Sequence, residues 1–226
     1  MAESLVLTSG PDELGTTVLT LNRPGKKNAL SIALREQVVE LLGRLADDQS
    51  VKALVITGSG GSFSAGFDLA EFTDPDPEHQ KRLWASSDQF HQRILRFPVP
   101  VIAAIDGVAY AGGFDLALLC DLRIATPQAR FGHPESVFGP VVYGPLHDLV
   151  GGAVARDLVL TGRQLDAEAA LSLHIVSEIV PQADLATRAE ELAHLASRAP
   201  REVLVRNKSK FLARSGIPPG TATLDL

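Results

Sequence analysis

The spacing of apolar positions along the chain switches repeatedly between two patterns, and these predict strands and helices in alternation. Residues 16–21 (TTVLTL) form a predicted strand that ends at the turn signal 22–25. Near-continuous apolar runs at 51–57 and 99–105 predict strands buried on both sheet faces. Shorter strands are expected at 122–126, 129–131 and 175–180.

Helical spacing follows most of these strands. Ser31 is a suitable N-cap for one predicted helix, Asp166 for another, and Asp68 begins a short helix with Glu71 as its capping-box partner. Strands alternating with helices predict an α/β fold. A loop of small residues is expected at 106–113, and the Pro/Gly/Thr-rich tail at 217–226 is expected to fray. The predicted helices cover 31–46, 78–96, 114–120, 145–150, 153–160, 167–173 and much of 184–213.

Composition narrows the possible functions. The net charge is −6 with no basic stripe, which argues against a nucleic-acid partner. Cys120 is the only cysteine, so neither an intrachain disulfide nor a thiolate metal cluster can form. No apolar run approaches the roughly 20 residues of a membrane span, and residues 1–13 lack a signal-peptide pattern. We therefore expect a cytoplasmic protein without a membrane partner.

Two segments rich in small residues, 63–68 and 107–115, each follow a buried strand and precede a helix. Small residues allow a ligand to approach the backbone closely, and N–H groups near a helix N-terminus favour negative charge. The two segments could together hold a developing oxyanion. Taken alone, they are better explained as two tight turns.

Four longer motifs resemble those of a known protein family. They are LNRPGKKNALS (21–31), VKALVITGSGGSFSAGFDL (51–69), PVIAAIDGVAYAGGFDLALLCDLRIA (100–125) and ARFGHPES (129–136). In this order and spacing, from about 18 to 211, the chain resembles the crotonase (enoyl-CoA hydratase/isomerase) superfamily. The resemblance implies a spiral of repeated ββα units over 1–182. A shortened C-terminal helical segment, 183–226, would follow and serve trimerisation.

The same resemblance implies an acyl-CoA thioester substrate and a homotrimer or dimer of trimers. It implies that two backbone N–H groups, those of Ala65 and Gly112, stabilise an enolate. Glu135 and Asp115 occupy the positions of the acid/base carboxylates. No metal or redox cofactor is implied, because CoA is part of the substrate. The residues expected to contact CoA or substrate are Ala29, Ala65, Gly66, Phe67, Asp68 and Gly112.

Departures from the family pattern leave alternatives open. Hydratases carry Glu where this chain has Asp115, whose shorter side chain reaches less far, and an acid there also simply offsets a helix dipole. Glu135 could be an ordinary loop acid, and His133 could tune or relay its proton. Tyr143 could donate to a ligand or pack in the core. Besides a hydratase or isomerase, we consider a dienoyl-CoA isomerase, a thioester hydrolase, C–C bond chemistry and a non-catalytic acyl-CoA-binding protein.

Overall fold

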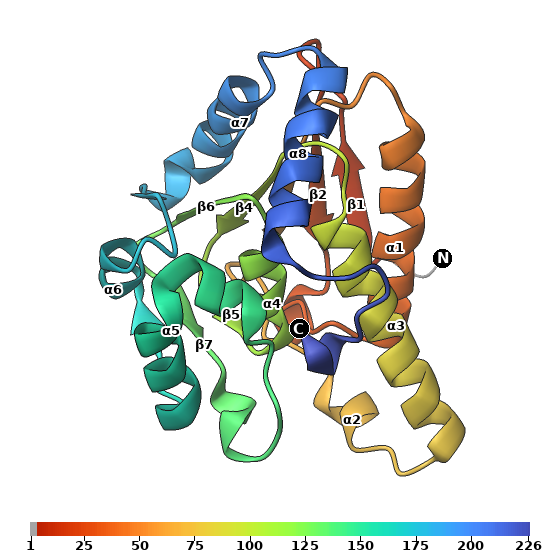
Figure 1. The fold of residues 1–226 in the computed structure, drawn as a ribbon, viewed down its shortest axis with the longest axis vertical. Coiled ribbons are helices and arrows are strands. Elements are labelled where there is room, and N and C mark those ends of the chain that lie inside the picture. The colour runs from red at the N-terminus through yellow and green to blue at the C-terminus, as the bar shows by residue number, and fades with distance from the viewer. Residues whose placement is uncertain (1–3) are drawn as a thin grey trace.

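A mostly parallel six-stranded sheet forms the centre of the molecule (Figure 1). The computed structural model describes residues 4–226. The segment 1–13, in which we found no signal-peptide pattern, therefore lies partly outside the described residues. Only β1 runs antiparallel to its neighbour β2. In order across the sheet, the strands are β1 (Val6–Ser9), β2 (Thr16–Leu21), β3 (Ala53–Gly58), β4 (Val101–Ile105), β6 (Leu122–Ala125) and β9 (Glu178–Ile179).

A second, three-stranded sheet lies beside the first. It contains β5 (Val108–Tyr110), β7 (Arg130–Gly132) and β8 (Leu165–Asp166), with β5 and β7 parallel. Strands of the two sheets alternate along the chain with helices that pack on them, which confirms the predicted α/β spiral. The helices are α1 (Ile32–Asp47), α2 (Leu69–Phe72), α3 (Pro77–Leu95), α4 (Gly112–Leu119), α5 (Gly144–Thr161), α6 (Ala167–Ser172), α7 (Leu185–Ala196) and α8 (Arg201–Ser215).

The predicted helix caps form, but the predicted capping box at Glu71 does not. The Ser31 hydroxyl accepts a hydrogen bond from the Leu34 N–H, and the Asp166 carboxylate accepts one from Ala169. Asp68 caps α2, but Glu71 does not complete a capping box, because its carboxylate accepts from the Ile32 N–H at 2.7 Å. This acid therefore joins α2 to the start of α1 and does not act locally.

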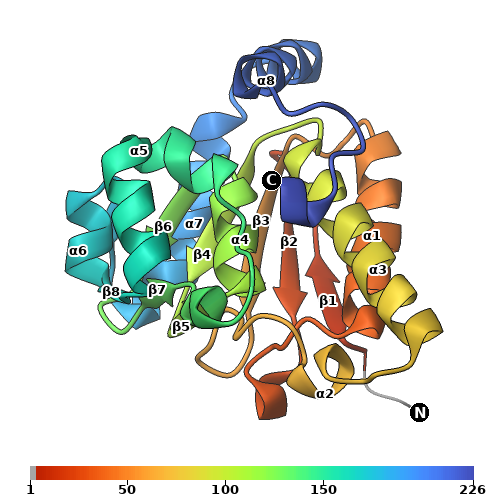
Figure 2. The same ribbon diagram turned by 60° about the horizontal axis from the view of Figure 1, so that its bottom comes forward.

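Apolar side chains cover both faces of the large sheet, which explains the continuous apolar runs. α7 contributes Leu185, Ala189 and Ala193 to one face (Figure 2). The other face packs against α1, α3 and α4 through a larger core that includes the fully buried Phe90 and Phe131. The part of the segment 183–226 that forms α7 thus packs on the chain's own sheet. The trimerisation role of the segment stays a prediction.

Several boundaries differ from the sequence prediction. The expected loop at 106–113 contains β5, because its backbone pairs with Arg130–Gly132 over three residues. The last strand shrinks to Glu178–Ile179, and β1 had no clear sequence signal. α5 joins the two predicted helices across a kink at Gly151, whose φ of 74° lies outside the helical region. These differences all depend on strand partners or backbone angles that are not encoded locally.

The C-terminal tail is ordered, which corrects the expectation that it frays. α8 stands off the body, and the chain then returns to α3 (Figure 2). The Thr223 N–H donates to the Asp88 carboxylate at 2.7 Å, and the Thr223 hydroxyl lies 3.0 Å from that of Ser87. Thr223 and Leu226 are both buried. Specific polar contacts thus outweigh the flexibility suggested by the composition of the tail.

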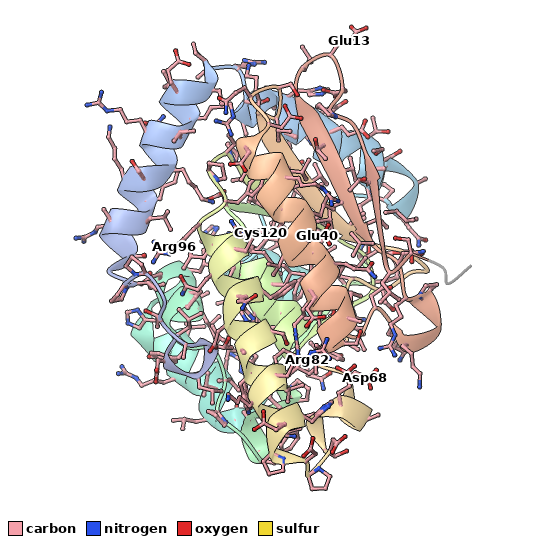
Figure 3. The ribbon with its side chains drawn as sticks, turned by 90° about the vertical axis from the view of Figure 1, so that its right-hand side faces the viewer. Glu13, Glu40, Asp68, Arg82, Arg96 and Cys120 are labelled. Atoms are coloured by element: carbon pink, nitrogen blue, oxygen red, sulfur yellow. The ribbon has the colours of Figure 1, made fainter. Side chains whose placement is uncertain are left out.

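α1 and α3 lie side by side and form one wall of the molecule (Figure 3). Arg82 on α3 makes an exposed ion pair with Glu36 on α1. Beneath it, the buried Arg35 guanidinium donates to the Leu30 and Leu83 carbonyls and to the Ser86 hydroxyl. Its charge is therefore held by hydrogen bonds within the wall.

No helix within residues 4–226 is long and apolar enough to cross a lipid bilayer.

Asn28 connects two loops at the edge of the large sheet. Its side-chain oxygen accepts from the Arg23 N–H at 2.8 Å, and its amide donates to the carbonyls of Ser59 and Ser62. Its φ of 52° is left-handed, a conformation that Asn tolerates better than most residues. The fully buried amide therefore holds the segment before α1 against the loop that follows β3.

We expect Asn28→Ala to destabilise the fold by about 3 kcal/mol, since each lost hydrogen bond costs about 1 kcal/mol and Ala is less suited to this φ. Urea unfolding should show a lower midpoint with an unchanged slope. Asn22→Ala is the control: it removes an exposed hydrogen bond to the Ser4 carbonyl and one from the Ser59 hydroxyl, neither of them fully buried. Equal midpoints for the two variants would contradict this account of Asn28.

Candidate active site

Three successive backbone N–H groups in the loop after β3 differ in whether they have an acceptor. The Ala65 N–H donates to the Lys27 carbonyl at 2.9 Å, and the Gly66 N–H donates to the Ser64 hydroxyl at 3.2 Å. Among the described residues, the Phe67 N–H has no acceptor. The prediction of Ala65 as a donor is therefore wrong: its N–H is already used to hold the loop.

Sequence reasoning missed Phe67 because the partner of Ala65 comes from a segment about forty positions earlier. One local signal did exist. Phe67 directly precedes Asp68, the N-cap of α2, and unengaged N–H groups gather where helices begin. Gly66 has a φ of 89°, a value that favours glycine, and this turns the backbone into that position.

The second donor lies at the start of α4. Ala111 adopts a strained φ of 51° between β5 and the helix, and the Gly112 N–H that follows has no acceptor among the described residues. The two loops touch: a Cβ added to Gly66 would lie 2.7 Å from the Ala111 Cβ and 3.2 Å from the Gly112 nitrogen. The structure therefore brings the Phe67 and Gly112 segments together, as predicted for the two small-residue loops.

Asp115 lies in the first turn of α4 and is buried. Its Oδ1 lies 2.8 Å from Nε2 of His133, which follows β7 and is also buried. Because a carboxylate offers only acceptors, the Nε2 atom carries the hydrogen and donates it. Burial disfavours the imidazolium, but the hydrogen bond and charge of Asp115 outweigh it and raise the pKa of His133.

Glu135 completes the cluster from the short helix η2 (Pro134–Val137). Asp115, His133 and Glu135 each place one polar atom within 4.8 Å of the others. The Glu135 Oε2 is buried and has no partner among the described residues. Burial raises the pKa of Glu135 to about 7, opposed by the charge of His133 and assisted by that of Asp115. This carboxyl can therefore both release and accept a proton near neutral pH.

The spacing of the three side chains would also admit a metal ion. However, Asp115 and His133 already satisfy one another at 2.8 Å, a hydrogen bond that two ligands of one ion would have to give up. Hydrogen bonding and proton exchange account for the cluster as it stands.

The remaining predicted residues line the same region. Ala29 is buried, and the Leu30 N–H beside it donates to the Gly66 carbonyl, so this segment supports the donor loop. Asp68, labelled in Figure 3, forms an ion pair with Arg23. Burial opposes ionisation of Asp68, but the Arg23 hydrogen bond lowers its pKa overall. Asp68 is thus a helix cap and an ion-pair partner, whatever its backbone contacts.

Tyr143 was also considered from the sequence. Tyr143 is half-buried, packs against the core and lies 5.6 Å from the His147 ring. The packing of Tyr143 thus agrees with the core alternative.

A cluster of aromatic side chains lies beside the two backbone N–H donors. The Phe67 ring lies 6.4 Å from Phe72 and 6.1 Å from Trp84, and the Arg35 guanidinium lies 4.3 Å from its centre. A Cβ on Gly112 would come within 3.0 Å of the Phe67 ring. An apolar wall therefore stands directly beside the Gly112 donor.

Comparison with known proteins identifies the family. The family model "Enoyl-CoA hydratase/isomerase" matches residues 12–225. The chain belongs to the enoyl-CoA hydratase/isomerase family. A short-chain-enoyl-CoA hydratase of Clostridium acetobutylicum is 34% identical, covering 81% of this chain and 72% of that protein. A 2,3-dehydroadipyl-CoA hydratase of Escherichia coli is 35% identical, covering 88% and 82%.

Solved structures agree with the family assignment. An enoyl-CoA hydratase of Bacillus anthracis superposes with a TM-score of 0.89 at 28% identity, covering 95% of this chain and 85% of that one. One from Mycobacterium smegmatis gives 0.87 at 34% identity, covering 99% and 88%. This member of the enoyl-CoA hydratase/isomerase family is an enzyme with the crotonase fold.

Glu135 should make the stability of this hydratase/isomerase depend on pH. The folded state retains the proton up to about pH 7, whereas the unfolded carboxyl loses it near 4.5. The resulting stabilisation is complete below pH 4.5 and lost as pH rises to about 7. Glu135→Gln should therefore gain thermal stability relative to the native protein across this interval. The control is Glu190→Gln, which changes an exposed acid on α7. Parallel curves of thermal stability against pH for the native protein and Glu135→Gln would contradict a raised pKa of Glu135.

Proposed function

We propose that the protein adds water to the double bond of an enoyl-CoA thioester. The observation that carries this proposal is the pair of carboxyl groups, Asp115 and Glu135, within 4.8 Å of one another. A hydrogen bond between oxygens spans about 2.8 Å, so one water molecule can contact both groups. Hydration needs such a pair, one group to activate water and one to exchange a proton with carbon.

The two carboxyl groups are suited to different roles. Asp115 accepts the proton of the attacking water, whose hydroxide adds to the carbon distal to the thioester. Glu135 gives its proton to the carbon next to the thioester, and its pKa of about 7 supports this step. A proton then passes from Asp115 to Glu135, which restores the site. The net reaction is the addition of one water.

The thioester oxygen gains negative charge before the carbon is protonated. In our proposal the N–H groups of Phe67 and Gly112 bind this oxygen, because both lack an acceptor among the described residues and their loops touch. Donors of this kind typically contribute about 10²–10³ in rate each. The start of α4 adds its dipole at Gly112. These steps are proton transfers, so we propose that no metal or redox cofactor takes part.

Isomerisation is the second candidate. It needs removal of a proton from one carbon and its return to another, which Glu135 alone could perform. The mass of the product separates the two reactions, since hydration adds 18 Da and isomerisation adds nothing. The family relationship and retention of both carboxyl groups weigh against a purely CoA-binding role.

Assembly and location are two further proposals. We propose a homotrimer or a dimer of trimers, supported by the family resemblance and by apolar side chains exposed on α5 and α8, among them Leu160 and Phe211. A cytoplasmic location is supported by the free, buried thiol of Cys120.

Glu135→Gln should abolish hydration while leaving substrate binding intact. The amide keeps the shape of the side chain but cannot transfer the proton, so kcat on crotonyl-CoA should fall by at least about 10²-fold. The Kd for the thioester should change little. Loss of the enoyl absorbance measures turnover, and calorimetry measures binding. Native activity in Glu135→Gln, with Glu190→Gln as the matched control, would remove Glu135 from the mechanism.

Sedimentation equilibrium tests the proposed assembly. A trimer should have about three times the 24.0 kDa mass of the chain, and a dimer of trimers about six times. A species of 24.0 kDa at micromolar concentration would exclude both.

A further inference from the structure

His133 is held in place from several sides. It follows Gly132 at the end of β7, and its ring lies 4.9 Å from the ring of Phe114 at an angle of 45°. Only 2% of His133 is exposed. An imidazole so enclosed cannot swing away from Asp115 without disturbing the core.

His133 donates the only hydrogen bond that the Asp115 side chain accepts among the described residues. The other titratable groups nearby are Glu135, which is also acidic, and His91 on α3. Burial lowers the pKa of His91, and its Nε2 has no partner. Among the described residues, neither group is hydrogen-bonded to the Asp115 side chain.

The short side chain of Asp115 makes the hydrogen bond from His133 important. Asp has one methylene fewer than Glu, so small rotations change where its oxygens point relative to a bound substrate. Misplacing a reacting group by about 1 Å can cost on the order of 10²-fold in rate. A hydrogen bond to Oδ1 fixes the rotation of the carboxyl group and leaves Oδ2 for another partner.

We propose that His133 is a positioning residue for the enzyme's reaction, orienting Asp115 through the Nε2–Oδ1 hydrogen bond so that its second oxygen meets the attacking water. The proposal rests on the hydration function given above. His133 itself exchanges no proton with the substrate. It completes the site where this chain carries the shorter acid.

The test is a double-mutant cycle measured on crotonyl-CoA. His133→Leu should lower kcat by about 10²-fold with little change in KM. His133→Gln, whose amide reaches about as far as Nε2, should restore most of this loss. Because His133 acts through Asp115, adding His133→Leu to Asp115→Asn should cause little further loss. Independent, multiplying losses in the double variant would overturn the proposal, as would an unaffected kcat in His133→Leu.

Two controls separate these effects from misfolding. His147→Gln changes an exposed histidine on α5 and should keep native kinetics. Thermal unfolding of each variant reports whether the fold survives. If His133→Leu does not fold, His133→Gln still tests the proposal by comparison with the native protein and Asp115→Asn. The proposal requires His133→Gln to be far more active than Asp115→Asn.

Nitrogen-15 NMR of the histidines tests the contact without turnover. In the native protein the neutral His133 should carry its hydrogen on Nε2, and its pKa should drop in Asp115→Asn. An Nδ1–H tautomer, or a pKa unchanged by Asp115→Asn, would overturn the positioning role. An inactive native protein that still shows the coupled pair would reject hydration of crotonyl-CoA but not the contact, which distinguishes the two failures.

Discussion

The backbone pairing of Ser64 with β5 is the constraint on which the site depends. Its N–H donates to the Val108 carbonyl, its own carbonyl accepts from Tyr110, and its hydroxyl donates to the Asn28 carbonyl. Ser64 is fully buried, so these bonds are shielded from water. They join the loop after β3 to the strand before α4, and thereby set the two unengaged N–H groups beside each other.

The acid/base cluster follows from where that pairing places α4 and β7. β5 also pairs with β7, so the residue after β7 arrives at the first turn of α4, where Asp115 lies. A buried carboxyl group costs free energy unless it is hydrogen-bonded. His133 meets that need for Asp115, while the Oε2 of Glu135 remains unpartnered. The same burial that is unfavourable for ionised Glu135 raises its pKa to about 7, where a proton donor is useful.

Local patterns predicted most elements well. β2 and the Ser31 and Asp166 caps formed as expected, because alternation and capping involve neighbours within a few residues. β5 and the ordered tail were not predicted, since both depend on partners far along the chain. Glu71 shows the same limit: its type and position suited a capping box, yet the folded chain offered it the Ile32 N–H.

The sequence by itself determined the family and the α/β spiral, and it singled out Asp115 and Glu135 as candidates, because residue types in a fixed order are enough for that. It could not determine which N–H groups are free. Ala65 looked suitable, but the Lys27 carbonyl occupies its N–H, whereas that of Phe67 has no acceptor among the described residues. Nor could it decide that His133 meets Asp115 rather than solvent. Both outcomes depend on distances between segments distant in the chain, and only the packed tertiary structure sets them.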